Sequence, residues 1–103
     1  MIKAGEYMLI KTTTKDDVFG DVIWRCDAVN VPLPDGKKTG LKFTMMGGTG
    51  PSARQGLVVV DSEKNIEANL KSGIAKIMPK ANAEAYAKQC LNDKTNTVAG
   101  IEM

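Results

Sequence analysis

The sequence contains no histidine among its 103 residues. Histidine is the commonest general base, the commonest metal ligand and the usual partner of a serine or cysteine nucleophile. Its absence argues against hydrolases of the triad and dyad types. Cys26 and Cys90 alone cannot complete a usual four-ligand zinc site. We therefore expect no catalytic residues, no metal and no cofactor, and the chain is predicted not to be an enzyme.

Cysteine is scarce as well: the sequence has two, far apart and in no C-x-x-C pair. In a reducing compartment such cysteines behave as small buried hydrophobic residues. Burial is therefore the expected state of Cys26 and Cys90. A disulfide between them stays open as an alternative, because their spacing does not forbid one.

Long apolar runs and runs of like charge are both missing. The longest unbroken apolar run spans residues 57–60, far short of the roughly 20 residues of a membrane helix. The first residues reach Glu6 and then alternate, unlike a signal peptide. We expect no membrane association and a cytoplasmic location, or a virion location if a phage encodes the chain.

The charges also bear on partners. The 14 basic and 12 acidic residues are interspersed, with a net charge of +2, so no basic stripe marks a nucleic-acid surface. Aromatic residues are few, and only Phe43 falls in a strand near basic residues, namely Lys37, Lys38 and Lys42. Nucleic acid is therefore disfavoured, and a protein partner or self-association is expected.

The residues that are present predict five short strands, over 6–12, 22–28, 41–45, 57–60 and 74–78. The clearest is 22–28, where Val22, Trp24, Cys26 and Ala28 alternate with Ile23, Arg25 and Asp27 as in a half-buried strand. Trp24 is expected in the core, and Arg25 with Asp27 as a surface ion pair. The 57–60 strand is apolar on both faces, which predicts a central or helix-covered position. It is expected to form a hairpin with 41–45.

Two helices are expected. The first runs to Ser72, with Asp61 or Ser62 as N-cap and Gly73 as the residue after its end. The second carries a single apolar stripe with Asn82 as N-cap. The stripe consists of Ala83, Tyr86, Ala87, Cys90 and Leu91.

These elements predict a small α+β domain over residues 1–92, followed by a C-terminal tail over 93–103. Their order resembles an SH3-like barrel of about five strands with a short helix and a C-terminal amphipathic helix. The alternative is an open antiparallel sheet with both helices packed on one face. Resemblance in element order carries no function.

The segment from Gly47 to Gly56 holds four glycines and one proline in ten residues. It is not a Walker A loop, because Gly56 is followed by Leu57 and Val58 instead of lysine and a hydroxyl residue. Residues 48–53 match G-x-G-x-x-A, yet a strand follows where a dinucleotide site needs a helix. We interpret the segment as a hairpin tip that contacts a partner.

The predicted binding residues are Met46, Gly48, Thr49, Gly50, Ser52 and Arg54. The leading hypothesis is a non-enzymatic interaction or assembly protein, of the kind found among phage virion subunits or host-factor-binding proteins. The alternative is a small anion- or nucleotide-binding protein that sequesters its ligand, with free amides of this loop as a cradle and Arg54 as a donor.

Overall fold

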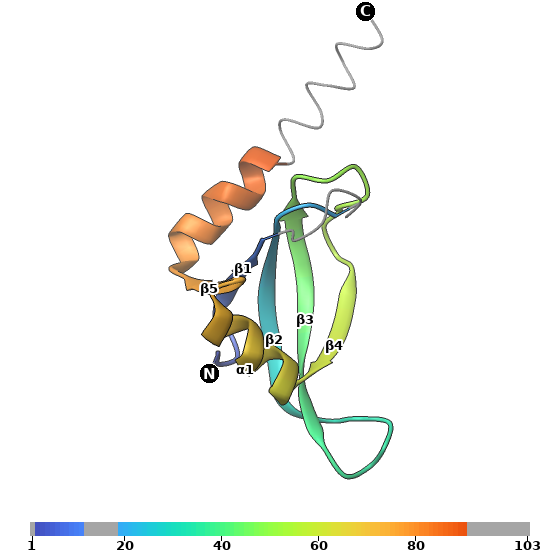
Figure 1. Ribbon diagram of the computed structural model, residues 1–103. Helices are drawn as coiled ribbons and strands as arrows, with labels where there is room; N and C mark the ends of the chain where they lie inside the picture. Colours follow the sequence, from blue (N-terminus) through green and yellow to red (C-terminus); the bar gives the residue numbers. More distant parts are fainter. Residues whose placement is uncertain (1, 12–18, 91–103) are drawn as a thin grey trace, which may run out of the picture.

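The computed structural model describes residues 2–11 and 19–90. They form one antiparallel sheet of five strands in the order β4-β3-β2-β1-β5 (Figure 1). The strands are β1 (Tyr7–Ile10), β2 (Val22–Pro32), β3 (Thr39–Gly48), β4 (Val58–Ser62) and β5 (Ala75–Met78). Helix α1 (Glu63–Ser72) joins β4 to β5, and a second helix covers residues 80–90. The predicted α+β class is confirmed.

The sheet is open, so the predicted SH3-like barrel is not confirmed. Closure would require β4 to pair with β5, but these are the two edge strands. Helix α1 connects β4 to β5 across one face of the sheet, so these two strands lie at opposite edges.

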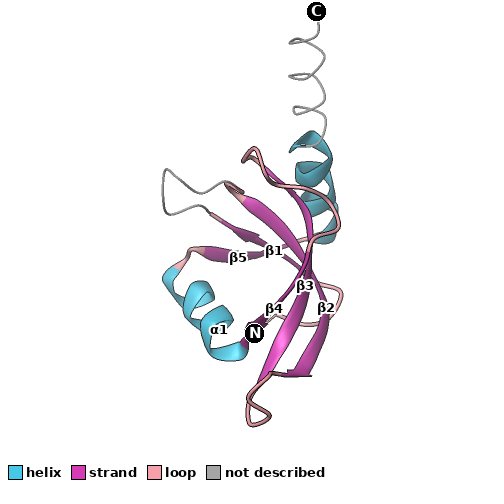
Figure 2. Cartoon of the chain, turned by 90° about the vertical axis from the view of Figure 1, so that its right-hand side faces the viewer, coloured by secondary structure: helices cyan, strands magenta, loops and turns pink. Residues whose placement is uncertain are grey.

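The two helices pack on opposite faces of the sheet, which also corrects the alternative with both helices on one face (Figure 2). Met8 belongs to the core cluster that includes Ile66 of α1. Its neighbour Tyr7 belongs to the cluster that includes Ala83 of the second helix. Because successive strand residues point to opposite faces, each face of β1 and β2 supplies its own core.

Helix α1 follows the prediction closely. Ser62 is its N-cap and accepts a hydrogen bond from the Asn65 amide at 3.1 Å. Gly73 ends the helix in the left-handed conformation, with φ of 85°, which glycine adopts without a Cβ penalty. The single fully buried side chain of α1 is Ile66, which anchors the helix to the sheet.

The second helix begins at residue 80, so Asn82 is not its N-cap. The Ala83 amide donates to the Pro79 carbonyl at 3.0 Å, which places the first helical turn directly after Pro79. The predicted stripe is confirmed at Ala83, Ala87 and Cys90, which are buried. Leu91 and the predicted tail over 93–103 lie outside the described residues, as does Thr12 at the end of the first predicted strand.

β4 is an edge strand, so the predicted central position is wrong, and α1 covers only the face on which Val59 lies. Val58 and Val60 are 49% and 48% exposed on the same face. The predicted hairpin with β3 is confirmed, in a regular register from Thr44↔Val58 to Gly40↔Ser62. The apolar composition of β4 therefore marks an uncovered surface.

β2 and β3 pair with register shifts that sequence alternation does not reveal. Cys26 pairs with Phe43 and Ala28 with Lys42, so Asp27 is an extra residue on β2. Past this bulge the alternation reverses, and Ala28 turns away from the face that Cys26 occupies. The prediction that the two residues share a face is therefore wrong.

Candidate interaction surface

The base of the glycine-rich segment is fixed by backbone hydrogen bonds. The Thr49 amide donates to the Asp21 carbonyl at 3.0 Å, and the Gly50 amide donates to the Phe19 carbonyl at 2.9 Å. The Thr49 Oγ1 accepts a hydrogen bond from the Asp21 amide at 2.9 Å. Two of the amides that the anion-cradle hypothesis requires therefore already have carbonyl partners.

The glycines in this base are needed for close packing. Gly48 belongs to β3, and a Cβ there would lie 2.7 Å from the Ala53 Cβ and 2.8 Å from the Phe19 carbonyl oxygen. Both distances are shorter than real side chains adopt. The absence of a side chain at Gly48 therefore allows the base of the segment to pack closely against Phe19 and Ala53.

The six predicted binding residues divide into three groups. Thr49, Ser52 and Arg54 are exposed, while Gly48 and Gly50 are buried. Met46 is half-buried and lies apart from the loop, on the face that the second helix covers. The structure thus gathers three of them on the loop surface and places Met46 elsewhere.

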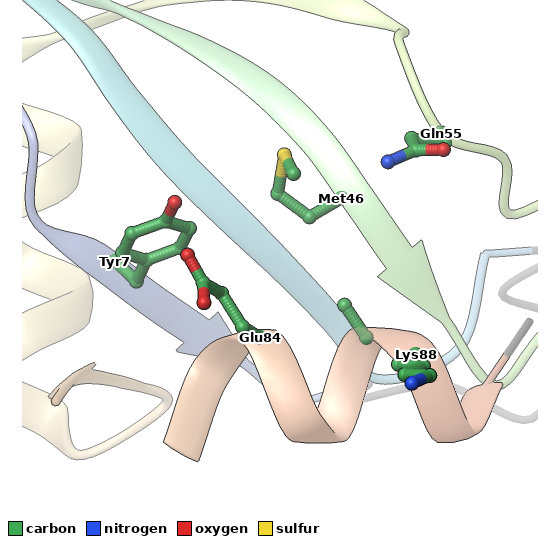
Figure 3. Close-up of a pocket in the computed structure, with 6 residues that line it drawn as sticks. Tyr7, Met46, Gln55, Glu84 and Lys88 are labelled. Atoms are coloured by element: carbon green, nitrogen blue, oxygen red, sulfur yellow. The ribbon is translucent and has the colours of Figure 1, made fainter. Parts of the chain in front are cut away.

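Met46 lines a groove between the sheet and the second helix (Figure 3). It is an extra residue in the β2–β3 register, since Trp24 pairs with Met45 and Ile23 with Gly47. Such a bulge re-aims a side chain. Met45 accordingly packs in the core cluster of Val22 and Ala53, while Met46 turns toward the helix.

The groove has a volume of about 330 Å³. Figure 3 shows Tyr7 and Glu84 at one end, Met46 in the middle, and Gln55 with Lys88 at the other end. Tyr7 is buried, and the rim carries one acid and one base. The lining of the groove therefore combines the apolar side chains of Met46 and Ala87 with the polar side chains of Gln55, Glu84 and Lys88.

Sequence reasoning missed most of this lining. Glu84 and Lys88 lie outside the apolar stripe predicted for the second helix, and nothing in the sequence indicates which residues they border. Tyr7 belongs to a predicted strand, but the alternation of the sequence does not show which element packs against the face that carries Tyr7. Both assignments depend on where the second helix docks.

A charged network lies on the open part of the same face. The Arg25 Nε donates to Asp27 Oδ1 at 2.7 Å, which confirms the predicted pair, and the Thr44 hydroxyl donates to Asp27 Oδ2. Burial raises the pKa of the Asp27 carboxyl, but the hydrogen bonds from Thr44 and Arg25 outweigh it. The net pKa lies below the ordinary value. The hydrogen bond to Asp27 and the charge of that carboxylate raise the pKa of Arg25.

The free edge of β4 presents unpaired backbone groups. The Met45 amide donates to the Leu57 carbonyl at 2.7 Å. Backbone groups of successive residues in an antiparallel strand point alternately to either side. Val59 and Asp61 therefore pair with β3, while Val58 and Val60 direct their amides and carbonyls outward. Among the described residues, none pairs with these outward groups.

The edge at β5 is better protected. β5 has four residues against five in β4, and Lys76 is exposed at its centre. Pro79, which has no amide hydrogen, follows directly. Short length, an exposed lysine and a proline are the devices by which proteins prevent unwanted strand pairing. β4 has no lysine or proline.

Other kinds of site are not seen in the described part of the chain. It contains no cluster of three or more cysteine, aspartate or glutamate side chains that could hold a metal ion. Cys26 and Cys90 are both buried and are not joined by a disulfide, so the disulfide alternative is wrong. None of the described helices combines the length and the apolarity that crossing a lipid bilayer takes.

Comparison with known proteins adds no relative. No protein-family model matches the sequence, and no curated protein or solved structure is significantly similar to it.

Proposed function

We propose that this chain is a non-enzymatic interaction or assembly protein, and that its contact element is the β3–β4 hairpin with the free edge of β4 as the main contact. The observation that carries the proposal is the edge itself. Val58 and Val60 offer outward backbone groups and half-exposed side chains in one short strand. An added strand would form hydrogen bonds with these backbone groups and would cover these side chains.

The loop residues have a secondary role in this proposal. Thr49, Ser52 and Arg54 are exposed near the end of β4 where the strand begins. They are positioned to contact a partner at the rim of the interface. Rim contacts of this kind set orientation more than affinity.

The test is the mass of the purified chain by light scattering over a range of concentrations. We expect a mass above the 11.1 kDa of one chain, rising with concentration. Val60→Lys should return the protein to one chain, because a lysine on an edge strand opposes pairing. Val29→Lys is the matched control, since Val29 is 39% exposed but lies on β2, away from the edge. A single-chain mass at every concentration would overturn the proposal.

A further inference from the structure

We infer that the strand that pairs with β4 is β4 of a second copy of this chain, antiparallel about a two-fold axis through Val59. This inference rests on the proposed function and adds the partner, the stoichiometry and the register. In this register Val58 lies opposite the partner subunit's Val60, and Val60 opposite the partner subunit's Val58. Each of these two pairs exchanges two backbone hydrogen bonds, so every outward group of Val58 and Val60 is satisfied.

The same register matches the side chains. Directly opposite residues in an antiparallel pair share a face of the sheet. Val58 and Val60 of both copies therefore form one cluster of four valines on the face where each is now half exposed. Val59, which packs toward the core beside α1, lies opposite the partner subunit's Val59. The two-fold axis is perpendicular to the sheet, so equivalent faces stay on one side.

Neighbouring registers lack the required backbone groups. A pairing centred on Val60 would place Ser62 in the ladder, but the Ser62 amide donates to Asp61 Oδ1 at 2.8 Å. A pairing centred on Val58 would need Gly56, whose amide donates to the Met45 carbonyl at 2.8 Å. A loop precedes β4 and helix α1 follows it directly, and between these two the outer edge of the strand is open (Figure 1). The available edge is therefore short and its centre is Val59.

Pairing between β4 and β5 of different copies is disfavoured. It would join unlike edges head to tail and build an open filament. Lys76 and Pro79 oppose strand addition at β5. Pairing of β4 with itself uses the same edge on both copies, which closes the assembly at two chains.

Cysteine crosslinking tests the register directly. In the proposed dimer the two Val59 Cα atoms are about 4.5 Å apart, within the span of roughly 4.4–6.8 Å that a disulfide bridges. The two Val58 Cα atoms are about 8 Å apart, offset by two residues along the strand. We expect Val59→Cys to form a covalent dimer under mild oxidation, and Val58→Cys or Val60→Cys alone to form none above wild type. A mixture of the last two should form a covalent heterodimer.

The mixture keeps the test valid if Val59→Cys fails to fold, because Val58 and Val60 are exposed positions. Wild type controls for the two native cysteines, and Ile77→Lys, on β5 and 43% exposed, tests the other edge. Crosslinking by Val58→Cys or Val60→Cys alone, a mass above two chains, or dissociation by Ile77→Lys would overturn this pairing while the assembly function stands. A single-chain mass throughout would overturn both.

Discussion

Arg25 and Asp27 lie two residues apart on β2 and are joined by a hydrogen bond of 2.7 Å from Nε to Oδ1. The pair sits at the bulge where Asp27 is the extra residue, beside Thr44 of β3. The bulge brings the carboxylate within reach of two donors at once. This network lies on the face of the sheet that also carries Val58, because Thr44 pairs with Val58.

The lowered pKa of Asp27 predicts a specific pH dependence of stability. The folded pKa lies below the unfolded value of about 3.9. The ionised carboxylate therefore stabilises the fold above the unfolded pKa, and this contribution is lost as the pH falls through the folded pKa. Asp27→Asn should lower the free energy of unfolding by about 1 kcal/mol near neutral pH. The effect is small because Arg25 is 40% exposed and solvent screens the pair.

The measurement for Asp27→Asn is urea unfolding near neutral pH and again in acid below both pKa values. The gap between wild type and variant should shrink in acid. Thr44→Val, which removes one donor, should change stability in the same direction by less. An equal gap at both pH values would mean that Asp27 acts through packing and not through its charge.

Close packing at Gly48 predicts that even a methyl group destabilises the hairpin. Gly48→Ala should cost about 1–3 kcal/mol, because the new Cβ meets the Phe19 carbonyl oxygen and the Ala53 Cβ. Thermal unfolding monitored by circular dichroism measures the loss. Ser52→Ala, in the exposed part of the same loop, should stay within about 0.5 kcal/mol of wild type. Equal stabilities for the two variants would contradict the packing described for the loop base.

The N-cap of α1 supports a third prediction. Ser62→Ala removes the acceptor of the Asn65 amide and should cost about 1 kcal/mol. Ser62→Asp should restore most of this, since aspartate is an equally good N-cap. Denaturant unfolding of the three proteins checks the order. If the aspartate variant is as unstable as the alanine variant, the cap is not the source of the loss.

The alternative hypothesis, in which the loop binds an anion, requires the amides of Thr49 and Gly50 to be available to that anion. Both donate to carbonyls, so we expect inorganic phosphate to leave the Tm unchanged. An anion present at a hundred times its Kd would stabilise the fold by about 2.7 kcal/mol. A phosphate-dependent rise in Tm that Arg54→Ala removes would favour the anion-binding alternative.

The part of the fold that could be predicted rests on local chemistry. Ser62 and Gly73 mark the ends of α1 by capping, and the stripe at Ala83 and Ala87 marks the second helix. These signals act within one or two turns of chain. The prediction of Asn82 as the N-cap is wrong because the helix already starts after Pro79, three residues earlier.

The rest depended on long-range arrangement. Three valines in a row read the same in a central strand and in an uncovered edge, and only the strand order distinguishes them. Met46 could not be assigned to the groove, because its direction depends on a bulge against β2. The contact surface was therefore predicted on the loop of this hairpin, whereas the exposed edge at Val58 and Val60, on which our proposal rests, was not predicted.

Ser62 ends β4 and caps α1, so the edge strand enters the helix without any intervening loop. Tension applied along β4 would act directly on the first turn of α1, because no slack residue separates them. Beyond Ser62 the backbone is helical, so a strand bound to β4 cannot continue its pairing past this residue. The start of the helix thus limits the paired edge at this one end.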